Sequence, residues 1–214
     1  MTSIGFLHTA HAHVGTFRAL MRELDPDRYD VHVVDESLLA EARERGVDED
    51  IRRRLLVRLR EVAAADAGVV VCTCSTLGGW AERMSDAVGV PVVRVDRPMA
   101  ETAVAAGRRI VIVATVASTL EPTRELLTSC AASGTEIVEA LCPDAWPLFE
   151  TGDLDGYAHR IAAHARTLDA DVIVLAQASM ALAEPLLAGS GKHVFSSPRI
   201  AVAYATQLCS KLHE

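Results

Sequence analysis

The feature that most constrains the fold is an internal repeat in which an apolar run ends in a polar segment. Residues 68–76 (GVVVCTCST) align with residues 171–179 (DVIVLAQAS) at an offset of 103, which pairs Cys74 with Gln177. Neither run alternates apolar and polar side chains, as expected of strands that are covered on both faces. The repeat therefore predicts two similar lobes, each with a buried central strand.

A second aligned pair sets the boundary between these lobes. Residues 4–9 (IGFLHT) resemble residues 110–115 (IVIVAT), and each segment is the first strand of its half. We therefore expect a first lobe over residues 1–100 and a second lobe over residues 101–198. The last stretch, residues 199–214, is predicted to be a helix that packs back on the first lobe.

Short runs of β-branched residues alternate with longer amphipathic or alanine-rich stretches, which is typical of the α/β class with mostly parallel sheets. The pattern predicts four strands flanked by helices in each pseudo-symmetric lobe. The expected strands are residues 3–8, 29–34, 68–74, 91–95, 109–115, 136–141, 171–176 and 193–196. Asp153 is predicted to begin the helix that precedes the strand at 171–176.

Composition excludes several classes of function. The formal net charge is −8, and neither acidic nor basic residues form a long run, which argues against a nucleic-acid partner. No apolar run approaches the roughly 18 residues that span a bilayer, and no basic leader follows Met1, so we expect a cytoplasmic protein without a membrane partner. The five cysteines are an odd set without a disulfide framework, and free thiols are expected.

The residues that could carry chemistry gather where the predicted strands end. In open parallel sheets, ligands bind beyond the carboxyl ends of the strands, where helix N-termini present free amides. Cys74 carries most weight, because a helix start favours the thiolate form of a thiol. The alternative is a buried filler cysteine, a role that suits Cys72 better. His8 is the most plausible additional base, since imidazole titrates near neutral pH.

Four short segments resemble the aspartate/glutamate racemase superfamily. They are residues 73–78 (TCSTLG), residues 7–9 (LHT), residues 113–118 (VATVAS) and residues 175–180 (LAQASM), and together they span essentially the whole chain. The resemblance implies a two-lobed fold with an active site in the cleft between the lobes, no cofactor, a small carboxylate substrate and a homodimer. It also implies hydroxyl and amide ligands for that carboxylate. The predicted substrate-binding residues are Thr9, Ser75, Thr76, Thr115, Ser118, Thr119, Gln177 and Ser179.

Gln177 departs from the family pattern, because racemases of this kind resemble each other in using a second cysteine there. A carboxamide neither accepts nor donates a proton usefully near neutral pH, although it can hydrogen-bond a carboxylate or an enolate. Three chemistries with the single thiol of Cys74 stay open, namely addition to an activated double bond, protonation after decarboxylation, and a racemase site shared with another base. A binding module without catalytic activity is the alternative from another class.

Two further patterns have ordinary interpretations. His8, His11 and His13 are spaced like metal ligands, but no cysteine or carboxylate completes a recognised zinc pattern, so no metal is expected. Arg97 follows Asp96 after a predicted strand, and a structural ion pair is preferred over a ligand for the substrate carboxylate.

Overall fold

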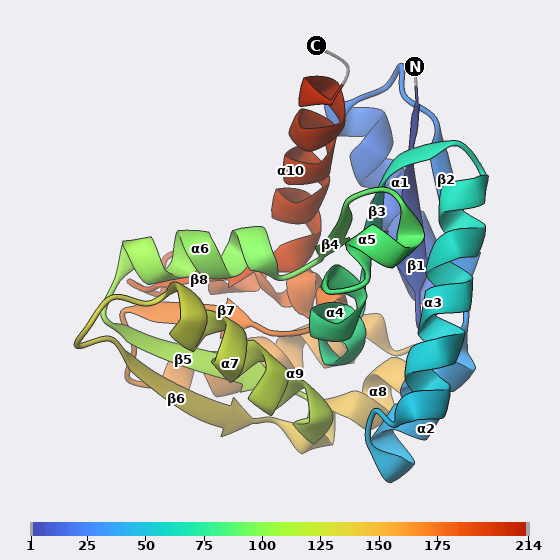
Figure 1. Cartoon of the computed structure of the whole chain (residues 1–214). Helices are drawn as coiled ribbons and strands as arrows, with labels where there is room; N and C mark the ends of the chain where they lie inside the picture. The colour runs from blue at the N-terminus through green and yellow to red at the C-terminus, as the bar shows by residue number, and fades with distance from the viewer. Residues whose placement is uncertain (1, 213–214) are drawn as a thin grey trace. The chain divides into compact units, whose positions relative to one another are not determined.

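The computed structural model describes residues 2–212, which form two compact α/β units (Figure 1). The first unit comprises the described residues up to Asp96 together with those from Pro198 onward, and the second comprises Arg97–Ser197. Each unit has its own sheet and its own hydrophobic core. No helix among these residues is long and apolar enough to span a membrane.

The first unit is built on a four-stranded parallel sheet with the order β2-β1-β3-β4. Parallel neighbours require crossover connections, and helices supply them here. The elements are β1 (Ser3–His8), α1 (Ala12–Leu24), β2 (Asp30–Val34), α2 (Glu36–Arg45), α3 (Glu49–Ala64), β3 (Ala67–Cys72), α4 (Ser75–Glu82), α5 (Ser85–Val88), β4 (Val92–Arg94) and α10 (Ser197–Lys211).

The second unit repeats this arrangement with the order β6-β5-β7-β8, again fully parallel. Its elements are α6 (Arg97–Ala106), β5 (Arg109–Ala114), η1 (Ala117–Thr119), α7 (Leu120–Cys130), β6 (Glu136–Leu141), η2 (Pro143–Ala145), α8 (Trp146–Glu150), α9 (Leu154–Thr167), β7 (Val172–Leu175), η3 (Ala178–Ala183), η4 (Pro185–Leu187) and β8 (His193–Ser196). Two sheets with the same strand order confirm the predicted α/β class with four parallel strands in each half.

Most predicted elements lie where the sequence placed them, with small differences at strand ends. Asp153 caps α9 as predicted, because its carboxylate accepts from Gly156 N at 2.9 Å. The strand predicted over residues 68–74 ends earlier, at Cys72. Cys74 instead precedes α4, and its carbonyl already accepts from Leu77 N.

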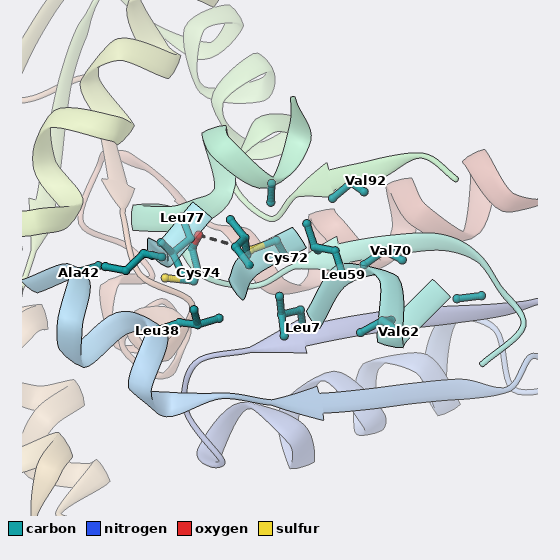
Figure 2. Packing of buried hydrophobic residues seen from close by; sticks show 14 residues of the cluster. Leu7, Leu38, Ala42, Leu59, Val62, Val70, Cys72, Cys74, Leu77 and Val92 are labelled. Carbon is teal, nitrogen blue, oxygen red and sulfur yellow. Dashed lines mark hydrogen bonds between the residues drawn. The ribbon is translucent and has the colours of Figure 1, made fainter. Parts of the chain in front are cut away.

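Side chains of β1 and β3 divide between two layers of helices because successive residues of a strand point to opposite faces. Leu7, Val70 and Cys72 belong to the cluster that includes residues of α2, α3 and α4 (Figure 2). Phe6 points the other way and its ring lies 5.3 Å from that of Phe17 on α1. The face on which a strand-end side chain lies therefore follows from its parity along the strand.

Close packing of α3 on the sheet depends on Gly5. A Cβ atom at this position would lie 2.1 Å from Val62 Cγ1 of α3, far inside van der Waals contact. Asp48 fixes the start of the same helix by accepting from Ile51 N at 2.9 Å. These contacts hold the layer of helices that covers the Cys72 face of the sheet.

In the second unit the same division of faces places α9 on one side of the sheet. Val111, Val113 and Leu175 belong to a cluster with the α9 residues Tyr157 and Ile161. All of these side chains are at most 2% exposed. Burial of an aliphatic or aromatic side chain of this size contributes about 1.5–3 kcal/mol, so these strands anchor the polar residues that follow them.

Candidate functional site

Cys74 lies at the start of α4, two residues beyond the end of β3. Its backbone is extended (φ −107°, ψ 112°), as expected of the residue that precedes a helix. Figure 2 shows its side chain beside Leu38 and Ala42 of α2 and near Leu77. Cys74 is 6% exposed, whereas Cys72 is fully enclosed, so the two neighbouring thiols differ in environment.

Two opposing effects act on the Cys74 thiol. Burial raises its pKa above the ordinary value of 9.0, since it penalises the thiolate. Hydrogen bonds from the hydroxyls of Thr9 and Thr76 and from the N–H groups of Leu77 and Thr76 act in the opposite direction. Burial prevails, so the resting side chain is a thiol whose surrounding donors already favour a negative charge. The helix start alone had indicated a thiolate, and burial accounts for the difference.

The first turn of α4 is buried and polar. Ser75 is 5% exposed and Thr76 is 8% exposed. Arg94 packs against Gly78 of α4. It donates from Nε and Nη2 to the two carboxylate oxygens of Asp96 at 2.7 and 2.9 Å. Asp96 thus forms a buried ion pair with Arg94, which was not singled out in the sequence.

His8 lies on a different face of the sheet from Cys74. It is fully buried, its Nδ1 lies 2.9 Å from Thr73 Oγ1, and its Nε2 lies 2.8 Å from His32 Nδ1. Burial, with a smaller contribution from nearby histidines, lowers the pKa of His8 to about 3. His8 is therefore neutral at pH 7 and is bonded to Thr73, without a contact that would let it take a proton from Cys74.

In the second unit, Gln177 takes the place that Cys74 has in the first. It directly precedes η3, and its backbone is extended (φ −114°, ψ 142°). Its Oε1 accepts from Thr115 N at 2.6 Å, from Thr115 Oγ1 at 2.9 Å and from Val116 N at 3.3 Å. Three converging donors fix this oxygen, and they identify Oε1 as the acceptor end of the carboxamide. The donor end, Nε2, makes no hydrogen bond within residues 2–212.

A buried hydroxyl network supports Thr115. Tyr157 is fully enclosed, and its hydroxyl lies 2.7 Å from Ser179 Oγ and 3.5 Å from Thr115 Oγ1. Thr119 is buried in η1, where its carbonyl accepts from Thr123, and Ser118 is half-buried beside it. Tyr157 was not among the predicted site residues, because an aromatic residue in a helix gives no sign of a hydroxyl partner.

The repeat seen in the sequence reappears as a repeated hydrogen bond. Thr9 and Thr115 are aligned residues that follow the first strand of each sheet. The Thr9 hydroxyl bonds to Cys74, and the Thr115 hydroxyl bonds to Gln177. The structure thus groups the predicted site residues into two equivalent clusters, one in each unit.

The histidines near the N-terminus form no metal centre in the described part of the chain. No group of three or more histidine, cysteine, aspartate or glutamate side chains between residues 2 and 212 could hold a metal ion. His8 is bonded to protein groups through both ring nitrogens. His32 and Asp30 extend this network and were not singled out in the sequence. The position of His32 along its strand could have indicated this contact. His32 pairs with Phe6 in the strand register, so it points to the same face of the sheet as Phe6 and His8.

Comparison with known proteins agrees with the two-unit fold and with the family resemblance of the sequence. The profile of the Asp/Glu/Hydantoin racemase family matches residues 9–205, which is most of the chain. The chain therefore belongs to the Asp/Glu/hydantoin racemase family. No curated protein sequence matches it.

Solved structures of racemases share the fold. A glutamate racemase isoform from Bacillus anthracis superposes with a TM-score of 0.79 at 15% identity, over 99% of this chain and 82% of that one. A glutamate racemase from Thermus thermophilus gives 0.74 at 18% identity, with coverage of 99% and 82%. A putative Asp/Glu racemase from Yersinia pestis gives 0.69 at 15% identity, with coverage of 98% and 100%. At these identities the likeness shows the fold.

Proposed function

We propose that this protein is a racemase-type isomerase, or a related lyase, that acts at the carbon next to the carboxylate of a small acid. Cys74 is the acid, base or nucleophile of the reaction. The observation that carries the proposal is the environment of this thiol, where two hydroxyls and two backbone N–H groups favour the thiolate while burial opposes it. A thiol that ionises to the thiolate only when a substrate is bound is suited to transient proton transfer.

Membership of the racemase family supports the proposal, and so does the similarity to solved structures of a glutamate racemase and a putative Asp/Glu racemase. Cys74 and Gln177, which follow the equivalent strands β3 and β7, are proposed to act on the same substrate, as the family resemblance implies.

Gln177 supplies a hydrogen-bond donor in place of a second thiol. Because Thr115 and Val116 hold Oε1, the Nε2 group is the part of the side chain left to bind a ligand. A donor here stabilises the negative oxygen of an enediolate but cannot deliver a proton to carbon. We therefore favour one-thiol chemistry over a symmetric exchange between two thiols.

The other predicted residues take supporting roles. Thr115 acts through Gln177, because its N–H and hydroxyl both donate to that side chain. Thr9 and Thr76 stabilise the charge on Cys74, while Ser75, Ser118, Thr119 and Ser179 provide hydroxyls near the two strand ends. His8 supports the loop through Thr73 and does not exchange protons with the substrate.

A binding protein without turnover is the second candidate. It is favoured by the loss of a titratable group at Gln177 and by the raised pKa of Cys74. Such a protein would bind small carboxylates yet leave their carbon–hydrogen bonds intact. Calorimetric titration with the same acids as used below would show affinity, and proton NMR would show no exchange.

The decisive experiment is proton NMR in D₂O with purified protein and a panel of small amino, hydroxy and unsaturated dicarboxylic acids. We expect deuterium at the carbon next to a carboxylate, or turnover of one panel member, without added pyridoxal phosphate and in the presence of EDTA. Cys74→Ser should abolish the signal. Cys130→Ser is the matched control, because this free thiol lies at the end of α7, outside both clusters.

An unchanged rate in Cys74→Ser would contradict the catalytic assignment. The family resemblance also leads us to propose a homodimer in the cytoplasm. Light scattering coupled to size-exclusion chromatography tests the dimer, since a mass near the 22.9 kDa of one chain would contradict it.

A further inference from the structure

A continuous chain of hydrogen bonds runs through the first unit from Asp30 to Thr73. Asp30 Oδ2 lies 2.5 Å from His32 Nε2, and His32 Nδ1 lies 2.8 Å from His8 Nε2. His8 Nδ1 lies 2.9 Å from Thr73 Oγ1, which in turn lies 3.1 Å from the carbonyl of Leu7. Four contacts thus link one carboxylate, two imidazoles, one hydroxyl and one carbonyl.

Aromatic rings enclose most of this chain. The ring of Phe6 lies 5.1 Å from that of His32, and the ring of Phe17 lies 5.4 Å from that of His8. His8 is fully buried and the His32 side chain is 3% exposed, whereas the Asp30 side chain is 20% exposed. Water therefore reaches the network at its Asp30 end, and the remainder depends on its internal partners.

Counting hydrogens shows how the neutral network is arranged. With Asp30 ionised, each neutral imidazole carries one hydrogen and Thr73 carries one, so three hydrogens serve four contacts. One contact therefore has no hydrogen, and its two atoms face each other with lone pairs that repel. This contact is the longest of the four, from Thr73 Oγ1 to Leu7 O. That carbonyl is still satisfied, because Thr73 N donates to it at 3.0 Å. The Thr73 hydroxyl then donates to His8 Nδ1, and His8 carries its hydrogen on Nε2.

When the network takes up one proton from solvent, the fourth contact also gains a hydrogen and becomes a hydrogen bond. His32 then carries hydrogens on both ring nitrogens and donates to Asp30 and to His8 Nε2. His8 still carries one hydrogen, now on Nδ1, from which it donates to Thr73. The Thr73 hydroxyl turns to Leu7 O. The total rises from three hydrogens to four, and the positive charge on His32 faces the Asp30 carboxylate.

We propose that Asp30 and His32 are positioning residues of the Cys74 site, which act through the tautomer of His8 on the hydroxyl of Thr73. The proposal rests on the proposed function for the role of Cys74. In the protonated state Thr73 bonds to strand β1 through both its N–H and its hydroxyl, and in the neutral state the hydroxyl leaves β1. The segment at Thr73, which leads into α4, thus makes two hydrogen bonds to β1 in the protonated state and one in the neutral state.

The groups around His8 keep its ring neutral in both states. Burial, with smaller contributions from His32, His13 and His11, lowers the pKa of His8 to about 3. Burial also lowers the pKa of His13 on α1 to about 4, so this neighbour adds no charge near neutral pH. His8 therefore changes its tautomer without changing its charge.

The charge is taken up by His32, whose pKa decides the midpoint of the switch. Burial lowers this pKa below 6.5, and Arg18 on α1, 3.3 Å from Asp30 Oδ2, acts in the same direction. Asp30 opposes both through its hydrogen bond and its charge. The neutral state consequently prevails at pH 7, and acidification below the usual imidazole range populates the protonated state.

Nitrogen-15 NMR of the imidazole rings tests the switch directly. In a titration from about pH 8 to about pH 4, we expect His8 to change from the Nε2–H to the Nδ1–H tautomer at the pH where His32 becomes charged. The exposed His159 on α9 serves as an internal reference. A single His8 tautomer throughout the titration of His32 would overturn the proposal.

Two variants separate the switch from general effects on folding. Asp30→Asn removes the carboxylate that favours charged His32, so the common midpoint should fall by about one pH unit or more. His32→Gln should leave His8 with one tautomer at every pH, provided that its amide spectrum shows a folded protein. If His32→Gln does not fold, the Asp30→Asn shift decides, and an unchanged midpoint contradicts the proposal.

The link to Cys74 is measured by iodoacetamide labelling followed by peptide mass spectrometry. In the natural sequence, the labelling rate should show a step of about twofold at the His32 midpoint, beyond the smooth rise of thiolate with pH. Thr73→Val should remove the step. Its absence in the natural sequence would contradict the positioning role. Lack of turnover with the switch intact would contradict the proposed function alone, so the two failures are distinguishable.

Discussion

The carboxyl ends of β3 and β7 occupy the same place in two sheets of equal strand order, yet they carry different chemistry. At the first, a hydroxyl from the aligned threonine bonds to the thiol of Cys74, and at the second it bonds to the carboxamide of Gln177. The duplicated scaffold has kept the donor while the acceptor differs. Of these two side chains only the thiol can exchange a proton, so the proposed acid–base chemistry is assigned to the first unit.

The segments that follow these residues differ as well. α4 is an α-helix that packs on Arg94, and η3 is a 3₁₀ helix. In the strand register the counterpart of Arg94 is Ser196, whose small side chain donates to Glu184. Gly78 lets α4 approach Arg94, whereas the aligned position in η3 is Ala181. A large buried cation thus accounts for a glycine in one half that the other half does not need.

The largest effect is expected at the thiol itself. Cys74→Ser replaces the sulfur by a much weaker acid and nucleophile, and we expect activity to fall by about 10²–10⁴-fold. The measurement is the deuterium incorporation or turnover described above. Retention of more than about a tenth of the rate would place the chemistry elsewhere.

The second prediction asks whether the β7 end contributes through its donor. Gln177→Glu keeps an oxygen for Thr115 and Val116 but replaces Nε2 by an acceptor, so kcat should fall by about 10–100-fold. Gln177→Ala removes both the oxygen and the nitrogen of the carboxamide, so its kcat should fall at least as far. If Gln177→Glu were fully active, the Nε2 donor would have no part in the reaction.

The third prediction concerns packing against Arg94. In Gly78→Ala the new Cβ would lie 2.9 Å from Arg94 Cβ, which should lower the free energy of unfolding by about 1–3 kcal/mol. Denaturant titration gives this value. The matched change Ala181→Gly should cost no more than about 1 kcal/mol. Equal costs at the two positions would show that the close approach to Arg94 carries no strain.

The smallest effects are expected from the matched threonines. Thr9→Val removes a donor that lowers the pKa of Cys74, so the pKa should rise further and iodoacetamide labelling at a fixed pH should slow by about tenfold or less. Labelling of the natural protein should itself rise with pH around a midpoint above 9.0, because burial disfavours the thiolate. A midpoint below 9.0 would mean that the four donors outweigh burial.

Thr115→Val is the counterpart change in the second unit. It removes one of the donors to Gln177 and should lower the free energy of unfolding by about 1 kcal/mol without altering the labelling of Cys74. A change in Cys74 labelling equal to that of Thr9→Val would show that the two strand ends are not independent.

Much of the fold was predictable because its signals are local. Apolar runs such as residues 172–175 mark buried strands, and the carboxylate of Asp153 marks a helix start. The less predictable features depend on partners far along the chain. The ion pair of Arg94 with Asp96 and the role of Tyr157 follow from which helix covers each strand end, and neither has a sequence signature.

The sequence by itself determined the duplication, the parallel α/β units and the placement of Cys74 and Gln177 at equivalent strand ends, because strand periodicity and turn chemistry act over a few residues. Tertiary structure alone decided the state of those groups. It raised the pKa of Cys74 through burial, fixed the Gln177 carboxamide through Thr115 and turned His8 toward Thr73 and His32. The physical reason is that desolvation and hydrogen bonding depend on neighbours that only folding brings within reach.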